Sequence, residues 1–143
     1  GLNGRLDTLQ AAVVLEKLKI FDKELSLRNK VAQIYNENIN SRFIKPFVPK
    51  KYFSSWAQYS ILTNSNEERD SLIAFLQSKD ISSMIYYRIT LHLQKVFKSL
   101  GYNTGDFPIS EDIASRVLSL PMHPYLSNKD QNHIISTINS YEK

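Results

Sequence analysis

The sequence predicts a domain of the mixed α/β (α+β) class, in which one long N-terminal helix precedes a small sheet flanked by shorter helices. Apolar residues recur every three or four positions over residues 7–40, which is the period of an amphipathic helix. Segment 55–62 alternates apolar and polar residues as a half-buried strand does, and 81–87 is expected to form a second strand. At 143 residues, 42% of them hydrophobic, the chain has the length of one domain with one core.

The long helix has recognisable start and stop signals. Asp7, followed three residues later by Gln10, resembles a capping box. Pro46 and Pro49 place a loop after the helical pattern. We therefore expect one helix over residues 7–40, with any bend near 25–27. A helix of this length in a small domain indicates a boundary, either between two domains or between two subunits.

Local signals predict the remaining elements. A turn leads into a helix at 67–78 whose first turn is acidic, so that strand, helix and strand form a small α/β unit. Further helices are expected near 93–100, at 111–118 with Ser110 as N-cap, and from Ser127 to about residue 141, where Ser127-x-x-Asp130 is a capping box. Residues 119–123 are expected to be extended.

Composition excludes several classes of protein. The chain has no Cys, so it forms no disulfide and no Cys-based zinc or redox site. No apolar run approaches the roughly 18 residues that span a bilayer, and we expect a cytoplasmic protein without a membrane partner. The net charge of +4 suits phosphorylated ligands without requiring nucleic acid. His92, His123 and His133 are too scattered for a metal site, so we expect hydrogen-bonded structural roles for them.

Three segments carry side chains suited to binding. Asn3 and Arg5 lie on a glycine-containing turn before the first helix, where an amide, a cation and helix N–H groups suit an anion such as phosphate. Tyr86 and Tyr87 end the second predicted strand and point to opposite faces, so one of them borders a cleft unless both only pack. The basic, aromatic segment 45–53 could stack single-stranded nucleic acid, but a solvated loop with its aromatic residues tucked under Trp56 is favoured.

A series of ordered blocks resembles one known family. The blocks are Gly1-Leu2-Asn3-Gly4-Arg5, Glu16-Lys17-Leu18, Arg28-x-x-x-Ala32-x-x-Tyr35, Trp56-Ala57-Gln58-Tyr59, Arg69-Asp70, Tyr86-Tyr87, Leu91-His92-Leu93-Gln94, Leu100-Gly101-Tyr102, Phe107-Pro108-Ile109-Ser110-Glu111 and the run 118–124. Together they resemble the small C-terminal domain of the DegT/DnrJ/EryC1/StrS sugar aminotransferases, which are fold-type I enzymes that use pyridoxal phosphate. The WbpE-like branch, which acts on UDP-N-acetyl-hexosamine uronic acids, looks closest.

The resemblance implies roles for five residues. Such an enzyme is a homodimer that moves an amino group from L-glutamate to a keto-sugar nucleotide for surface polysaccharide synthesis. Asn3 would hydrogen-bond the cofactor phosphate across the dimer, and Arg5 would lie by the acidic end of the substrate. Tyr86 and Tyr87 match an aromatic pair on the substrate side, and His92 lies in the loop just beyond them.

The chain also departs from the family pattern. The run Arg88-Ile89-Thr90 stands where family members have Pro-x-Pro, which loosens the loop and adds a cation. The Schiff-base lysine and the large cofactor domain are not expected within the 143 residues, so the chain carries no catalytic residue of its own. Alternatives are a dTDP-keto-deoxysugar aminotransferase, a stand-alone interaction module and, third, a nucleic-acid binder.

Overall fold

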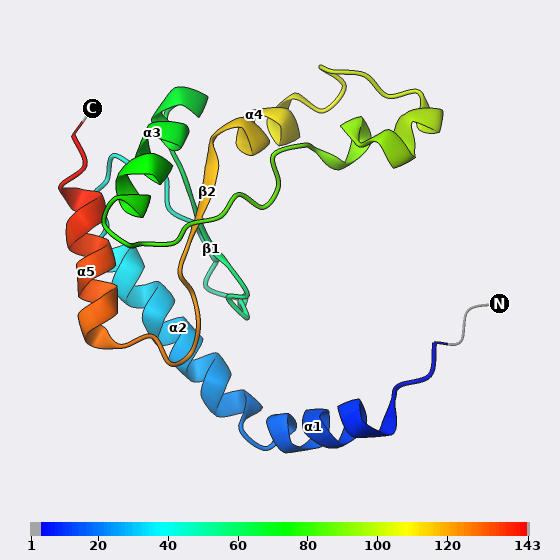
Figure 1. Cartoon of the computed structure of the whole chain (residues 1–143), viewed down its shortest axis with the longest axis vertical. Helices are drawn as coiled ribbons and strands as arrows, with labels where there is room; N and C mark the ends of the chain where they lie inside the picture. The colour runs from blue at the N-terminus through cyan, green and yellow to red at the C-terminus, as the bar shows by residue number, and fades with distance from the viewer. Residues whose placement is uncertain (1–3, 143) are drawn as a thin grey trace.

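The computed structural model describes residues 4–142, and Figure 1 shows a helical arm that leads into a two-stranded sheet covered by helices on one side. The elements in order are α1 (Thr8–Leu18), α2 (Phe21–Asn38), β1 (Tyr59–Leu62), α3 (Asn66–Gln77), the 3₁₀ turns η1 (Leu91–Leu93) and η2 (Lys95–Leu100), α4 (Pro108–Arg116), β2 (Val117–Leu120) and α5 (Asn128–Asn139). The predicted mixed class, with a long helical N-terminus and a small sheet, is confirmed.

The single long helix that the sequence predicted is wrong, because two helices meet at an elbow between residues 18 and 21. The N–H groups of Lys19 and Ile20 turn to carbonyls three residues back, at 3.2 Å each, and this tightening ends α1. The expected bend at 25–27 lies inside the regular helix α2. None of the residues of α1 is buried, whereas α2 buries Val31, Ala32 and Tyr35, so packing holds only the second helix.

The sheet pairs strands that are far apart in the sequence. β1 and β2 are antiparallel, with Ser60 opposite Ser119, and their hydroxyl oxygens lie 2.7 Å apart. The predicted strand at 81–87 is wrong, because only Met84 pairs with β2, as an isolated bridge to Ser119. The predicted strand at 55–62 begins only at Tyr59, since Trp56 has a left-handed φ of 49° that interrupts an extended run.

Caps explain where the later helices begin. α3 follows Ser65, whose side chain accepts the N–H of Glu68 at 3.2 Å, close to the predicted start. α4 begins at Pro108, at a position where a proline loses no helical hydrogen bond, so the expected cap at Ser110 is wrong. The predicted helix at 93–100 is two 3₁₀ turns instead. The capping box of α5 is confirmed, because the Ser127 hydroxyl accepts the N–H of Asp130 at 3.0 Å.

Helices α2, α3 and α5 enclose the core against the sheet (Figure 1). Tyr35, Tyr59 and Trp56 form its aromatic centre, with ring centroids 4.9 and 5.7 Å apart. The Tyr35 hydroxyl donates to the carbonyl of Pro121 at 2.9 Å, and burial raises the pKa of Tyr35 and Tyr59. Both phenols therefore stay neutral and act as hydrogen-bond donors within the core.

Replacing Ser127 with alanine removes the cap of α5 and is expected to cost about 1 kcal/mol of folding free energy. The measurement is urea denaturation followed by circular dichroism. Ser136→Ala is the matched control in the interior of the same helix, where alanine is at least as good a helix former. Equal loss of stability in both variants would contradict the assignment of the cap.

Candidate functional site

The predicted anion site at the N-terminus is only partly within the described residues. Asn3 lies outside them, whereas Arg5 is exposed on the segment that precedes α1. The Asp7 side chain accepts the N–H groups of Leu9 at 2.8 Å and Gln10 at 3.3 Å. The helix N-terminus is therefore occupied by its own cap, which corrects the expectation that its N–H groups face a ligand.

Helix α1 carries this segment away from the sheet (Figure 1). Its apolar side chains are exposed in the chain as it stands, including Leu9, Val13, Leu15 and Leu18. A salt bridge of 2.9 Å from Lys17 to Glu24 of α2 connects the two helices across the elbow. An apolar helix without buried residues is suited to packing against further protein.

Tyr86 and Tyr87 lie on an irregular strip between α3 and α4, where a strand was predicted. The peptide bond between them is cis, and their rings meet edge to face with centroids 5.8 Å apart. Both side chains are exposed, and the strip separates two hollows. Tyr86 borders both hollows and Tyr87 borders the second, so the structure brings the pair to the edge of cavities.

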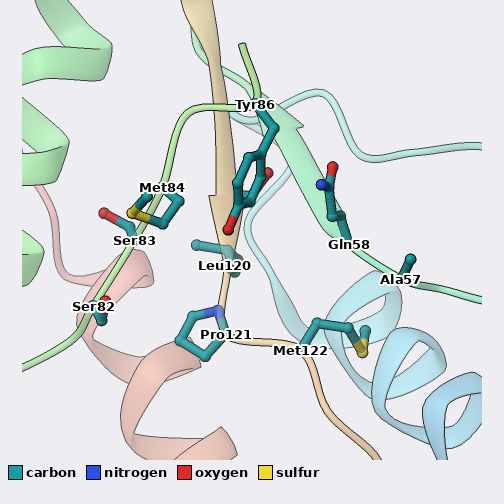
Figure 2. Close-up of a pocket in the computed structure, with 10 residues that line it drawn as sticks. Ala57, Gln58, Ser82, Ser83, Met84, Tyr86, Leu120, Pro121 and Met122 are labelled. Carbon is teal, nitrogen blue, oxygen red and sulfur yellow. The ribbon is translucent and has the colours of Figure 1, made fainter. Parts of the chain in front are cut away.

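The first hollow, of about 330 Å³, opens beside the end of β2 (Figure 2). Its wall combines Leu120, Pro121 and Met122 with residues of the strip, and Figure 2 shows the ring of Tyr86 reaching toward Leu120, with Gln58 at its side. Polar groups come from Gln58, Ser82, Ser83, Ser119 and the phenol of Tyr86. Hydroxyls and an amide around an apolar floor suit a polar, uncharged ligand group such as part of a sugar.

The second hollow, of about 460 Å³, is a slot between the strip and helix α4. The strip provides Tyr86, Tyr87, Ile89, Thr90, Leu91 and Gln94, and the other wall provides Ser110, Ile113, Ala114 and Val117. The hydroxyl of Thr90 is buried here and has no hydrogen-bond partner among the residues that the structure describes. The predicted aromatic pair thus stands at the boundary between two clefts, one on each side of the strip.

His92 is turned toward α4 and is only 8% exposed at its side chain. Its Nε2 lies 3.0 Å from Oε1 of Glu111, and its ring packs against Phe107 with centroids 4.7 Å apart. Sequence reasoning did not single out Glu111 as a functional residue. The available signal was an acidic side chain in the first turn of a helix.

The other two histidines also have hydrogen-bond partners. Nδ1 of His123 accepts the N–H of Tyr125 at 3.2 Å, and Nε2 of His133 lies 3.2 Å from the carbonyl oxygen of Lys79. Within residues 4–142, no three or more His, Asp or Glu side chains are grouped as metal ligands. Across the same residues, no helix combines the length and the apolar character that a membrane span needs.

The basic segment differs from its expected packing. Trp56 is buried, and its Nε1 donates to Asn29 at 3.1 Å, but Phe47 and Tyr52 are exposed instead of tucked beneath it. Lys45 is a structural cation, because its Nζ binds the carbonyls of Asn36 at 2.7 Å and Ile39 at 3.0 Å. These carbonyls lie at the C-terminus of α2, where a cation is favoured.

Comparison with known proteins shows what the chain is similar to. It is 38% identical over 127 residues to the UDP-2-acetamido-2-deoxy-3-oxo-D-glucuronate aminotransferase of Pseudomonas aeruginosa, covering 88% of this chain and 34% of that protein. It is 33% identical over 142 residues to the dTDP-3-amino-3,6-dideoxy-alpha-D-galactopyranose transaminase of Aneurinibacillus thermoaerophilus, covering 99% of this chain and 38% of that protein. The chain thus spans only about a third of the length of these relatives.

A solved structure agrees with the sequence relatives. The crystal structure of a DegT DnrJ EryC1 StrS aminotransferase from Brucella abortus superposes with a TM-score of 0.87 at 48% identity, covering 96% of this chain and 36% of that one. The family model for the DegT/DnrJ/EryC1/StrS aminotransferase family matches residues 1–139. That match includes the arm, both hollows and the last helix. The chain therefore belongs to the DegT/DnrJ/EryC1/StrS aminotransferase family.

Proposed function

We propose that this chain is the small C-terminal domain of a nucleotide-sugar aminotransferase that moves an amino group from L-glutamate to a keto-sugar nucleotide. The observation that carries the proposal is the family match over residues 1–139, together with the substrate named for the Pseudomonas relative. That name points to a UDP-N-acetyl-hexosamine uronate as the sugar, for surface polysaccharide synthesis in the cytoplasm. The large domain and the Schiff-base lysine then belong to the part of the relatives that this chain does not cover.

Pyridoxal phosphate is the cofactor of this family, and it supplies the electron sink for amino transfer. In this proposal, residues of the N-terminal arm act toward its phosphate and toward the substrate. Arg5 is an exposed cation on an arm that projects from the domain, and Asp7 keeps the neighbouring helix N–H groups occupied. Asn3 would donate its amide N–H to the phosphate, and Arg5 would pair with the carboxylate of the sugar.

The aromatic pair supplies the substrate wall in this proposal. Tyr86 and Tyr87 would contact the sugar nucleotide from the strip, and the hydroxyl-lined first hollow would receive a polar part of it. His92 is buried against Glu111 and would act through its neighbours rather than by touching the substrate. The exposed apolar face of α1 would be covered by the large domain or by the second subunit of a homodimer.

Two other functions remain as alternatives to the uronate enzyme. The Aneurinibacillus relative supports a dTDP-keto-deoxysugar aminotransferase, whose substrate has no carboxylate for Arg5. A stand-alone interaction module is the alternative outside enzymes. Substrate preference distinguishes the deoxysugar enzyme from the uronate enzyme. The interaction module is distinguished by whether the full-length protein carries a cofactor domain.

The test is to express the enzyme from its full reading frame with pyridoxal phosphate and record its absorption spectrum before and after borohydride. We expect a yellow protein whose colour bleaches as a lysine adduct becomes covalent, and whose spectrum shifts when L-glutamate is added. UDP-linked and dTDP-linked keto sugars then identify the acceptor. A colourless protein whose absorption spectrum does not change with L-glutamate would refute the proposal and favour the interaction module.

A further inference from the structure

The strip that carries Tyr86 and Tyr87 is anchored at both ends. Upstream, Met84 and Ser119 exchange backbone hydrogen bonds of 3.1 and 2.7 Å, which attach the strip to β2. Downstream, His92 binds Glu111 at 3.0 Å, which attaches the strip to α4. The aromatic pair lies between these two anchors.

Glu111 joins three segments with one carboxylate. Besides His92, it accepts the N–H of Gly105 at 2.9 and 3.0 Å, one to each oxygen, and the N–H of Phe107 at 3.3 Å. The left-handed φ of 98° at Gly105, which suits glycine, turns that N–H back toward the helix. The pKa of Glu111 lies below its usual value, mainly because the carboxylate accepts the Gly105 N–H. Burial alone would raise this pKa, whereas the Phe107 N–H and His92 lower it further.

The bond between His92 and Glu111 connects the two walls of the second hollow. One wall is the strip and the other is α4, whose residues Ser110 and Ile113 flank Glu111 along the helix. The width of the slot therefore depends on how firmly the downstream end of the strip, at His92, is attached to α4. The side chains of the pair are 8% and 18% exposed, so the bond is largely shielded from competing water.

Few features stiffen the middle of the strip, upstream of the 3₁₀ turn η1, in which the Leu93 N–H donates to the carbonyl of Thr90 at 3.1 Å. The strip has no proline between residues 84 and 94, so no backbone φ is locked by a ring. Arg88, at its centre, is 62% exposed and reaches Asp70 only at 3.8 Å. An exposed ion pair of that length adds little to stability.

We infer that Glu111 is a positioning residue: through His92 and the 105–107 turn it holds the strip against α4 and so sets where Tyr86 and Tyr87 stand. The inference rests on the proposed function only where it concerns the substrate. Without the carboxylate, the strip stays attached at Met84, but its downstream end loses the hydrogen bond to α4 and keeps the packing of the His92 ring on Phe107.

The first experiment measures the anchor itself by limited trypsin digestion. In Glu111→Ala, cleavage after Arg88 is expected to become about 10-fold faster, since charge-assisted hydrogen bonds no longer oppose local opening. Cleavage after Lys50 and Lys51, in a separate exposed loop, should keep its rate and serves as an internal control. Glu111→Gln keeps one acceptor oxygen but loses the charge, so it should restore part of the protection. Asp112→Asn, on the same helix but paired with Arg116, is the matched control.

The second experiment uses the enzyme from its full reading frame. Glu111→Ala should raise KM for the keto-sugar nucleotide about 10-fold, and Glu111→Gln should recover part of this loss, while the glutamate half-reaction changes little. Equal acceleration at Arg88 and at Lys50 and Lys51, or none at either, would overturn the anchor. Faster cleavage at Arg88 with an unchanged KM would overturn its role toward substrate. If no cofactor is bound at all, the proposed function fails, and digestion still decides the anchor.

Discussion

Replacing Arg5 with alanine in the full-length enzyme is expected to lower kcat/KM for a UDP-linked keto-uronate about 100-fold. A guanidinium paired with a carboxylate makes charge-assisted bonds, and their loss corresponds to roughly two powers of ten. Arg5 lies on the exposed arm before α1 and outside the hydrophobic core, so its removal should leave the core intact. The measurement is steady-state kinetics with the uronate and with a matched deoxysugar nucleotide, at saturating glutamate.

The deoxysugar nucleotide provides the internal control, because it has a methyl group where the uronate has a carboxylate, and a methyl group forms no ion pair with Arg5. Arg5→Lys keeps the charge but loses the planar pair of donors, so it should recover only part of the uronate rate. Lys23→Ala removes an exposed cation on α2 and should change neither substrate's kinetics. Full uronate turnover by Arg5→Ala would remove Arg5 from the substrate site and leave the deoxysugar enzyme as the better reading.

Replacing Glu68 with alanine is expected to destabilise the domain by about 3 kcal/mol, at the low end for breaking a buried ion pair. Glu68 is 1% exposed at its side chain, whereas its partner Arg42 is 27% exposed and can regain water. Its carboxylate accepts Nε of Arg42 at 2.8 Å and the backbone N–H of Asn64 at 2.8 Å. The loss is measured by urea denaturation of the variant and the parent chain.

The pH dependence gives an independent check on the same carboxylate. Burial alone would raise the pKa of Glu68, but the hydrogen bonds from Asn64 and Arg42 outweigh it and hold the pKa below its ordinary value of 4.5. The stabilisation is therefore complete above about pH 4.5 and is lost as the pH falls through the lower, folded-state pKa. Glu68→Gln should reduce this acid-dependent loss. An identical acid transition in Glu68→Gln and the parent would contradict the argument.

Short-range signals in the sequence predicted the elements that depend on neighbouring residues. The helix caps at Asp7 and Ser127 and the helix at α3 were found because a side chain and the N–H groups it caps lie within one turn. The position of Tyr86 and Tyr87 at the edge of a cleft was also predicted, but their expected opposite orientation is wrong, because their rings meet edge to face with centroids 5.8 Å apart and both border the second hollow.

Long-range packing produced the errors. The partner of β1 is β2, whose four residues are all buried, so its sequence shows no strand alternation and was read partly as the end of a helix. The apolar period runs continuously through the break between α1 and α2, so the sequence pattern does not show it. Only contacts with the rest of the domain distinguish α2, which packs on the core, from α1, which has no buried residue.

The sequence by itself therefore determined the mixed fold class, the family and the candidate residues Arg5, Tyr86 and Tyr87, since these follow from local pattern and ordered motifs. Only the tertiary structure decided that His92 faces Glu111 and that the strip divides two hollows. The physical reason is distance along the chain. His92 and Glu111 are 19 residues apart, and a hydrogen bond over that separation exists only after the strip has folded back onto α4.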